Sequence, residues 1–152
     1  MTKDELKIQL ATIFPNHTID ETVDFVVMWL SADELPIIAK QIKEDETLQF
    51  DFLFCQTAVD KLTHFEVIYH LTSTEYRHCL TLKVKLENRA QASIESVVSL
   101  WQAAELYENE IFDLFGIHFT NHPNLRRLFL GDDWPGFPLR KDYKDAINIV
   151  SL

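Results

Sequence analysis

The sequence contains few glycines, which allow sharp turns of the backbone, and few cysteines, which can cross-link it. Its 152 residues include only three glycines and two cysteines. Cys55 and Cys79 stand alone, with no CxxC pair, which argues against an iron–sulfur cluster or a zinc ribbon held by this chain. We therefore expect two buried free thiols in a reducing compartment.

Long hydrophobic runs are also missing. A membrane-spanning helix needs about 18 or more consecutive apolar residues, whereas the best candidate here, residues 25–30, has the length of a strand. The N-terminus alternates charged and apolar residues and offers no apolar stretch for a secretory signal. These two absences predict a cytoplasmic protein.

Basic residues are scarce, with 14 lysines and arginines against 24 acidic residues. The excess lies in residues 1–76, which hold five basic and fourteen acidic side chains. Such a surface does not suit non-specific binding to nucleic acid or to an anionic membrane. The length and the 47% hydrophobic content instead fit one globular domain with a core of its own.

The spacing of apolar residues predicts an α+β domain. Thr2 with Glu5, and Ser31 with Glu34, form capping-box patterns ahead of apolar residues at helical spacing. Strict alternation at 65–71 and 80–86 predicts two antiparallel strands. The predicted order is a helix ending by Pro15, strand 25–30, helix 35–42, strands 53–59, 65–71 and 80–86, and helix 101–115 capped by Gly116. An antiparallel-rich mixed sheet with helices packed on it is the economical fold for this order.

Glycine and proline, which interrupt helices and strands, are concentrated late in the chain. All three glycines and three of the five prolines lie between residues 116 and 138. We therefore predict an α+β domain over residues 1–116 and an extended irregular arm over residues 117–152. The arm is rich in arginine and large apolar side chains without regular periodicity, which is the composition of an interface anchor. It either folds back over its own sheet or docks on another protein.

The sequence gives little support for a catalytic site in this chain. Glu108, Glu110 and Asp113 form no obvious acid/base pair, and we interpret the carboxylates of this helix as solvated. His118 and His122 have the spacing of a zinc site on a helix, with Glu110 or Asp113 nearby, but Gly116 and Pro123 argue against a helix there. The sequence contains no glycine-rich phosphate loop and no nucleophile motif.

Two stretches carry a resemblance to a known family. ENEIFDLFGIHFTNHPNLRRLFL at 108–130 and GFPLRKDY at 136–143 resemble the signature of the thirty-kilodalton subunit, or C subunit, of respiratory complex I, the NADH:quinone oxidoreductase. The similarity extends upstream to about residue 48. The motif residues are Glu108, Glu110, Asp113, Phe115, Gly116, His122, Pro123, Pro138, Leu139 and Asp142.

The chain departs from this signature at three residues. Asn109 stands where the family typically has arginine. The family typically shows Gly-His-Pro twice; Asn121 stands at the glycine of the first and Phe137 at the histidine of the second. The first histidine of that pattern is kept as His122.

The resemblance implies a non-catalytic structural subunit of a peripheral arm. A protein of this kind has no cofactor of its own; FMN and iron–sulfur clusters belong to partner subunits. It docks mainly on the D subunit, with the B, I and G subunits also in the complex, on the cytoplasmic face of the bacterial inner membrane. It does not bind nucleic acid, and it meets the membrane only through the complex. Our docking hypothesis names Arg126, Arg127, Trp134, Phe137, Arg140 and Lys141.

Three alternatives remain open at this point. An equivalent subunit of a membrane-bound energy-converting hydrogenase or formate hydrogenlyase looks similar over the same motif. A metal-dependent hydrolase using His118, His122 and Glu110 is more remote. A free-standing adaptor for an unrelated protein would be a soluble monomer.

Overall fold

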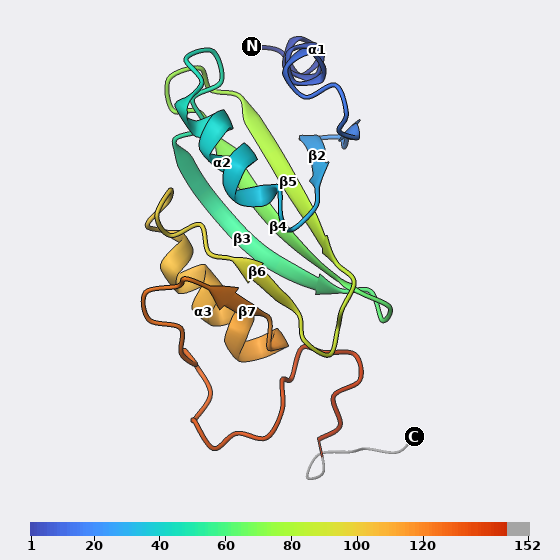
Figure 1. The fold of residues 1–152 in the computed structure, drawn as a ribbon, viewed down its shortest axis with the longest axis vertical. Helices are drawn as coiled ribbons and strands as arrows, with labels where there is room; N and C mark the ends of the chain where they lie inside the picture. Colours follow the sequence, from blue (N-terminus) through green and yellow to red (C-terminus); the bar gives the residue numbers. More distant parts are fainter. Residues whose placement is uncertain (146–152) are drawn as a thin grey trace.

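The computed structural model describes residues 1–145 and contains a five-stranded mixed sheet with three helices (Figure 1). The strands lie in the order β1, β2, β5, β4, β3. Their bounds are β1 Ile19–Glu21, β2 Val26–Leu30, β3 Phe52–Asp60, β4 Phe65–Thr72 and β5 Cys79–Leu86. In this sheet only β2 and β5 run parallel, so the predicted antiparallel-rich α+β fold is confirmed.

The core lies on one face of the sheet. Along β4, every second residue from Phe65 to Leu71 is fully buried, and each lies opposite a buried residue of β5, as Tyr69 lies opposite Leu82. Helix α2 (Leu35–Glu44) packs on this face through Leu35, Ile38 and Ile42. The apolar residues that recur at helical and strand spacing in the sequence therefore pack together in one hydrophobic core.

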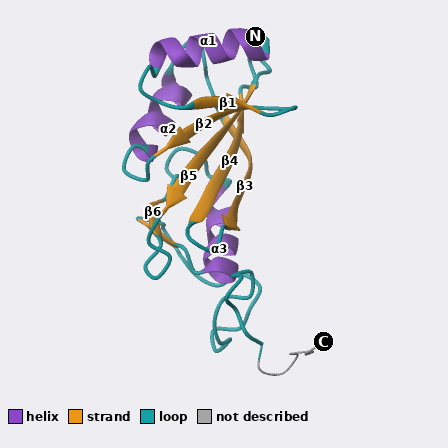
Figure 2. Ribbon diagram, turned by 90° about the vertical axis from the view of Figure 1, so that its right-hand side faces the viewer, coloured by secondary structure: helices purple, strands orange, loops and turns teal. Residues whose placement is uncertain are grey.

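Helix α1 (Lys3–Ile13) lies against β1 and β2 at one end of the molecule (Figure 2). Thr2 and Glu5 form the predicted capping box with both reciprocal hydrogen bonds. At Ser31 the pattern works only in part: Glu34 accepts from the backbone N–H and the hydroxyl of Ser31, but α2 begins at Leu35 without a side-chain cap.

The far end of the molecule is built from α3 (Ala104–Phe115) and a small parallel pair of strands, β6 (Ser93–Glu95) and β7 (His118–Thr120). Helix α3 begins three residues after the predicted start and ends at Gly116, as expected. Ile117 and Phe119 are buried, so regular structure continues four residues past the predicted boundary. We call residues 121–145 the arm. Residues 146–152 of the predicted arm lie outside the described residues.

The cysteine prediction was right in one respect and wrong in another. Cys55 and Cys79 are free, as predicted, but they are half-buried rather than buried. The sequence analysis did not predict the short strands β1, β6 and β7. Each strand is three residues long, which is too short to show an alternating pattern, and β6 pairs with β7, which is distant in sequence. Within residues 1–145, no helix is long and apolar enough to span a bilayer.

Candidate functional site

Helix α3 turns a row of polar side chains toward the protein interior. Glu108, Asn109 and Asp113 are each at most 1% exposed. The interpretation of Glu108 and Asp113 as solvated carboxylates was therefore wrong. Of the three carboxylates considered on this helix, Glu110 alone is in partial contact with solvent. Buried polar groups need partners, and most partners of this row come from the arm or from the loop before α3.

Asp113 holds the arm through its backbone. Its Oδ2 accepts the N–H groups of Leu128, Phe129 and Leu130 at 3.0, 2.7 and 3.0 Å, and its Oδ1 accepts from Nη1 of Arg127 at 3.1 Å. Burial acts to raise the pKa of this carboxyl, but the hydrogen bonds from the arm outweigh burial and hold the pKa below its usual range. Asp113 is therefore a charged anchor for an irregular segment.

Arg127 closes the arm on itself. Besides Asp113, its guanidinium donates to the backbone carbonyls of Trp134 and Gly136 at 3.2 and 3.1 Å. It also lies over the Phe137 ring, 5.0 Å from the ring centroid. One side chain thus joins α3 to residues 134–137 of the arm.

The next contact along the arm uses a residue that departs from the family signature. The Asn109 side-chain oxygen accepts the N–H of Arg126 at 2.9 Å. Asparagine at position 109 thus supplies an acceptor that arginine lacks.

The side chain of His122 is also buried. Its Nδ1 accepts the Asn124 N–H, so the proton lies on Nε2, which faces the Glu105 carbonyl at 3.1 Å.

Gly116 and Phe137 meet at the C-terminus of α3. Gly116 has φ +71°, the left-handed conformation of a helix cap, and a Cβ at this position would lie 2.5 Å from the Phe137 ring. Arg140 lies over the same ring and donates to the carbonyls of Phe115 and Gly116. Phe137, the last of the departures from the signature, is therefore half-buried against residues of its own chain.

The end of the arm returns to the turn between β3 and β4. Asp60 accepts the Lys141 N–H at 2.9 Å and pairs with Arg89, which also contacts Asp142 at 3.3 Å. Burial acts to raise the Asp60 pKa, but the N–H groups of Lys141 and Leu62 and the Arg89 guanidinium bring it below the usual range. Buried carboxylates thus hold the arm at two places, Asp113 at residues 127–130 and Asp60 at Lys141.

Glu108 is the carboxyl of this row whose hydrogen bonds come from the loop before α3 and not from the arm. It accepts from the Ser96 hydroxyl at 2.6 Å and the Val97 N–H at 2.9 Å, with His122 Nε2 3.8 Å away. Burial raises its pKa to about 7, against the opposing effect of those hydrogen bonds.

A Glu108→Gln variant should therefore show a pH-dependent gain in stability. The native carboxyl binds its proton more tightly than the unfolded one, so its contribution is complete below about pH 4.5 and is lost as pH rises through about 7. Glutamine, always neutral, should raise the free energy of unfolding by about 3 kcal/mol at pH 8 and change it little at pH 4.5. Urea unfolding at both pH values measures this; an equal effect at both would contradict it.

The structure does not bring the proposed zinc ligands together. His118 lies exposed on β7, and both ring nitrogens of His122 contact backbone groups. Within the described part of the chain, no cluster of three or more His, Cys, Asp or Glu side chains could hold a metal ion.

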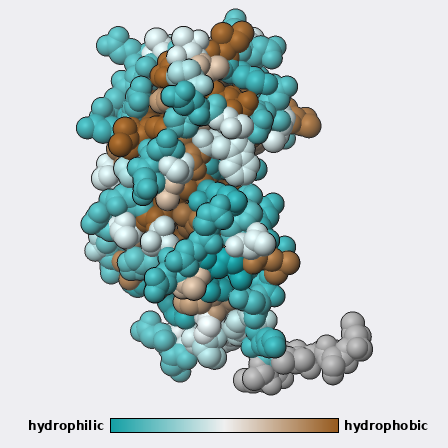
Figure 3. All heavy atoms as spheres, turned by 45° about the vertical axis from the view of Figure 1, so that its right-hand side comes forward, coloured by the Kyte–Doolittle hydropathy of each residue, from teal (hydrophilic) through white to brown (hydrophobic). Residues whose placement is uncertain are grey.

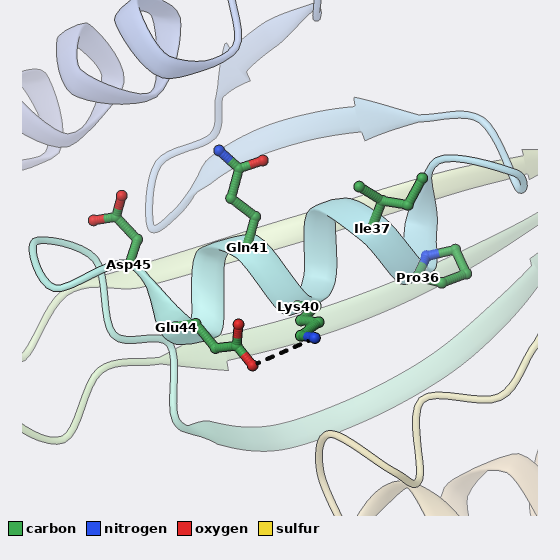
Figure 4. Close-up of a pocket in the computed structure, with 6 residues that line it drawn as sticks. All are labelled: Pro36, Ile37, Lys40, Gln41, Glu44 and Asp45. Carbon is green, nitrogen blue, oxygen red and sulfur yellow. Dashed lines mark ion pairs between the residues drawn. The ribbon is translucent and has the colours of Figure 1, made fainter.

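An open hollow lies on the outer side of α2 (Figure 4). All its lining residues come from this helix and its end, with Ile37 71% exposed and Lys40 paired to Glu44. It has no second wall and no converging polar groups, so it does not resemble a ligand site.

The outward residues of the arm differ from the residues that anchor it. Phe129, Trp134 and Leu139 are 67%, 41% and 51% exposed, and Arg126 and Lys141 are exposed as well. On the side shown in Figure 3, hydrophobic atoms form scattered patches among hydrophilic ones. Of the predicted docking residues, Arg127, Phe137 and Arg140 are engaged within the chain, whereas Arg126, Trp134 and Lys141 remain outward.

Sequence reasoning missed the inner partners of the arm. Asp60 and Arg89 lie far from the arm along the chain, and nothing in their local spacing marks them. Asn109 was identified only as a departure from the signature, and its contact with the arm appears only in the fold.

Comparisons with known proteins agree on one family. Residues 28–146 match the family model described as respiratory-chain NADH dehydrogenase, 30 Kd subunit. The C subunit of NADH-quinone oxidoreductase from Citrifermentans bemidjiense is 38% identical over 141 residues, covering 90% of this chain and 86% of the relative. The same subunit from Moorella thermoacetica is 37% identical, with 90% and 91% covered.

Two further similarities bear on assembly. The C/D subunit of NADH-quinone oxidoreductase from Phocaeicola vulgatus is 37% identical over 127 residues, which cover 80% of this chain but only 24% of that protein. Among solved structures, a chain of the membrane-bound sulfane sulfur reductase, an archaeal respiratory membrane complex, is similar with a TM-score of 0.78 and 25% identity. The match covers 93% of this chain and 85% of that one.

Proposed function

Because this chain belongs to the family of the 30 kDa subunit of respiratory-chain NADH dehydrogenase, we propose that it is a structural, non-catalytic subunit of a proton-translocating NADH:quinone oxidoreductase. In this proposal it docks on the D subunit through the arm and supports electron transfer from NADH to quinone, on the cytoplasmic face of the membrane. FMN and iron–sulfur clusters belong to partner subunits, which include B, I and G.

The observation that carries this proposal is the construction of the arm. Four buried groups, Asp113, Asn109, Asp60 and the carbonyl at the end of α3, hold an irregular segment whose Phe129, Trp134 and Leu139 face outward. Large apolar side chains on a rigid support are what a protein interface uses as anchors. Relatives in which C and D are named as one protein support D as the partner.

A pull-down tests the assignment directly. The tagged full chain, isolated in mild detergent from its native membranes, should bring down the D-subunit homologue together with NADH-oxidising flavin subunits, identified by mass spectrometry. Recovery of the chain alone would overturn the proposal and return attention to a free-standing adaptor.

The outward arm residues give a sharper prediction. Replacing Phe129 and Trp134 together by alanine should reduce the recovered D-subunit homologue about tenfold or more, because interface aromatics carry much of the binding energy. The urea midpoint of the chain should change little, since both side chains face solvent. Ile8→Ala is the control: Ile8 is 68% exposed on α1, at the other end of the molecule. Loss of the homologue in the control, or wild-type recovery in the double variant, would argue against docking through the arm.

A second candidate follows from the structural neighbour. Its parent complex is named a sulfane sulfur reductase, so the same fold serves a respiratory membrane complex with another activity. An equivalent subunit of a related complex, including an energy-converting hydrogenase, predicts recovery of the same D-subunit homologue without flavin subunits for NADH. The composition of the pull-down separates the two assignments.

A further inference from the structure

The turn between β3 and β4 contains a leucine that breaks two local rules. Leu62 is 60% exposed and has φ +69°. A non-glycine residue with positive φ is uncommon, and asparagine or aspartate adopts this conformation more easily than leucine. The other non-glycine residues with positive φ among residues 1–145 are polar: Gln49, Arg77 and Asn121.

The turn is held in this conformation by its own hydrogen bonds. The Leu62 N–H donates to Oδ1 of Asp60 at 2.7 Å, and the Lys61 N–H donates to the His64 carbonyl at 2.9 Å. Strained conformations persist where the surroundings fix them, and they concentrate at functional sites. An apolar side chain that is both strained and exposed gains nothing for the fold of this chain alone.

The position of this turn points to a partner. The same Asp60 carboxylate that holds Leu62 accepts the Lys141 N–H, and Arg89 joins Asp60 to Asp142. Figure 1 shows the red end of the arm returning below the turn between β3 and β4. Leu139, 51% exposed, lies two residues before Lys141 in the chain. We call Leu62, Leu139 and the ion-paired Asp60, Arg89 and Asp142 the exit corner.

We propose that the exit corner is a second contact with the D subunit, separate from the outward aromatic residues of the arm, with Leu62 as its apolar anchor. This inference rests on the proposed function. In the fused relatives a segment similar to this chain covers only 24% of a protein named for both subunits. A segment similar to this chain and a D segment are thus named as parts of one polypeptide in those proteins. The exit corner is continuous with the arm, because Asp60 accepts the Lys141 N–H and Arg89 pairs with Asp142. A D subunit seated on the arm therefore lies beside this corner.

A Leu62→Asn variant separates docking from folding because the two effects have opposite signs. Asparagine tolerates positive φ, so the urea midpoint of the purified chain should rise. Loss of a desolvated leucine anchor should reduce the D-subunit homologue recovered in the pull-down by about tenfold. A side chain with only a structural role would move both readouts in the same direction.

Leu106→Asn is the matched control. Leu106 is also 60% exposed, but it lies in the first turn of α3, away from the exit corner. Recovery of the D-subunit homologue with this variant should equal that of the wild-type chain. If the wild-type chain recovers none of the D-subunit homologue, the proposed function is wrong. If the wild-type chain and the Leu62→Asn variant recover equal amounts of this homologue, only the docking role of the exit corner is refuted.

Photo-crosslinking identifies the partner. A photoreactive residue placed at Thr63, exposed beside Leu62 in the turn, should form an adduct with the D-subunit homologue in intact membranes, whereas one placed at Leu106 should not. An adduct with a second copy of this chain, with any other protein of the complex or with lipid would overturn the assignment of this corner. The absence of an adduct while the homologue still co-purifies would overturn it too.

Discussion

Replacing Asp113 by alanine is expected to release the arm and to lower the free energy of unfolding by about 3 to 5 kcal/mol. The variant leaves three N–H groups of the arm without their acceptor and removes the carboxylate that pairs with Arg127. The direct readout is trypsin cleavage after Arg126 and Arg127, which should become faster than in the wild-type chain. Urea unfolding gives the change in stability.

The matched control is Asp132→Ala, which removes an exposed carboxylate of the same arm. It should change neither proteolysis nor unfolding beyond the usual small surface effect. Equal behaviour of the two variants would show that Asp113 does not hold the arm.

The Asp113 anchor also predicts how acid acts. Its folded pKa lies below the unfolded value, so its contribution to stability is present above the usual aspartate pKa and is lost as pH falls through the lower folded value. The wild-type arm should therefore become sensitive to protease in acid, whereas the alanine variant should be sensitive at every pH. This dependence has the opposite sign to that of Glu108, whose pKa is raised.

Replacing Gly116 by alanine should be comparably damaging, at about 3 kcal/mol, for two reasons that act together. A residue with a Cβ is strained at φ +71°, and the added atom would lie 2.5 Å from the Phe137 ring. The ring would have to leave the C-terminus of α3, and with it the cation–π contacts of Arg127 and Arg140. Thermal or urea unfolding measures the loss.

A double-mutant cycle with Phe137→Ala distinguishes the two reasons. Removing the ring should recover the part of the loss due to the clash and leave the part due to backbone strain. Gly131→Ala is the control, since its φ is not positive and its Cβ would meet only the flexible Asp133 side chain. Additive effects of Gly116→Ala and Phe137→Ala would mean that the ring does not pack on this glycine.

Much of the domain could be predicted from the sequence because its signals are local. The alternation at 65–71 and 80–86 became β4 and β5, paired antiparallel with the alternating apolar residues directly opposite one another. The Thr2 and Glu5 pattern became a complete capping box. Period and capping depend on residues a few positions apart, so a single sequence contains the information they need.

The inner face of α3 could not be predicted in the same way. Asp113 is buried because three N–H groups from an irregular segment fifteen to seventeen residues later need an acceptor, and no local pattern reports that need. The same limit applies to Asp60, whose partner Lys141 is 81 residues away. The signature motif marked Asp113 as important, but its physical role appears only in the fold.

The anchored arm has a consequence for the speed of association. Fixing one residue of a free chain costs about 1 to 2 kcal/mol of conformational entropy, so an arm that ordered itself only on docking would lose much of its gross binding energy. Here Asp113, Asn109 and Asp60 order the segment before any encounter. A partner that approaches this arm meets a preformed surface, and capture does not have to wait for a segment to fold.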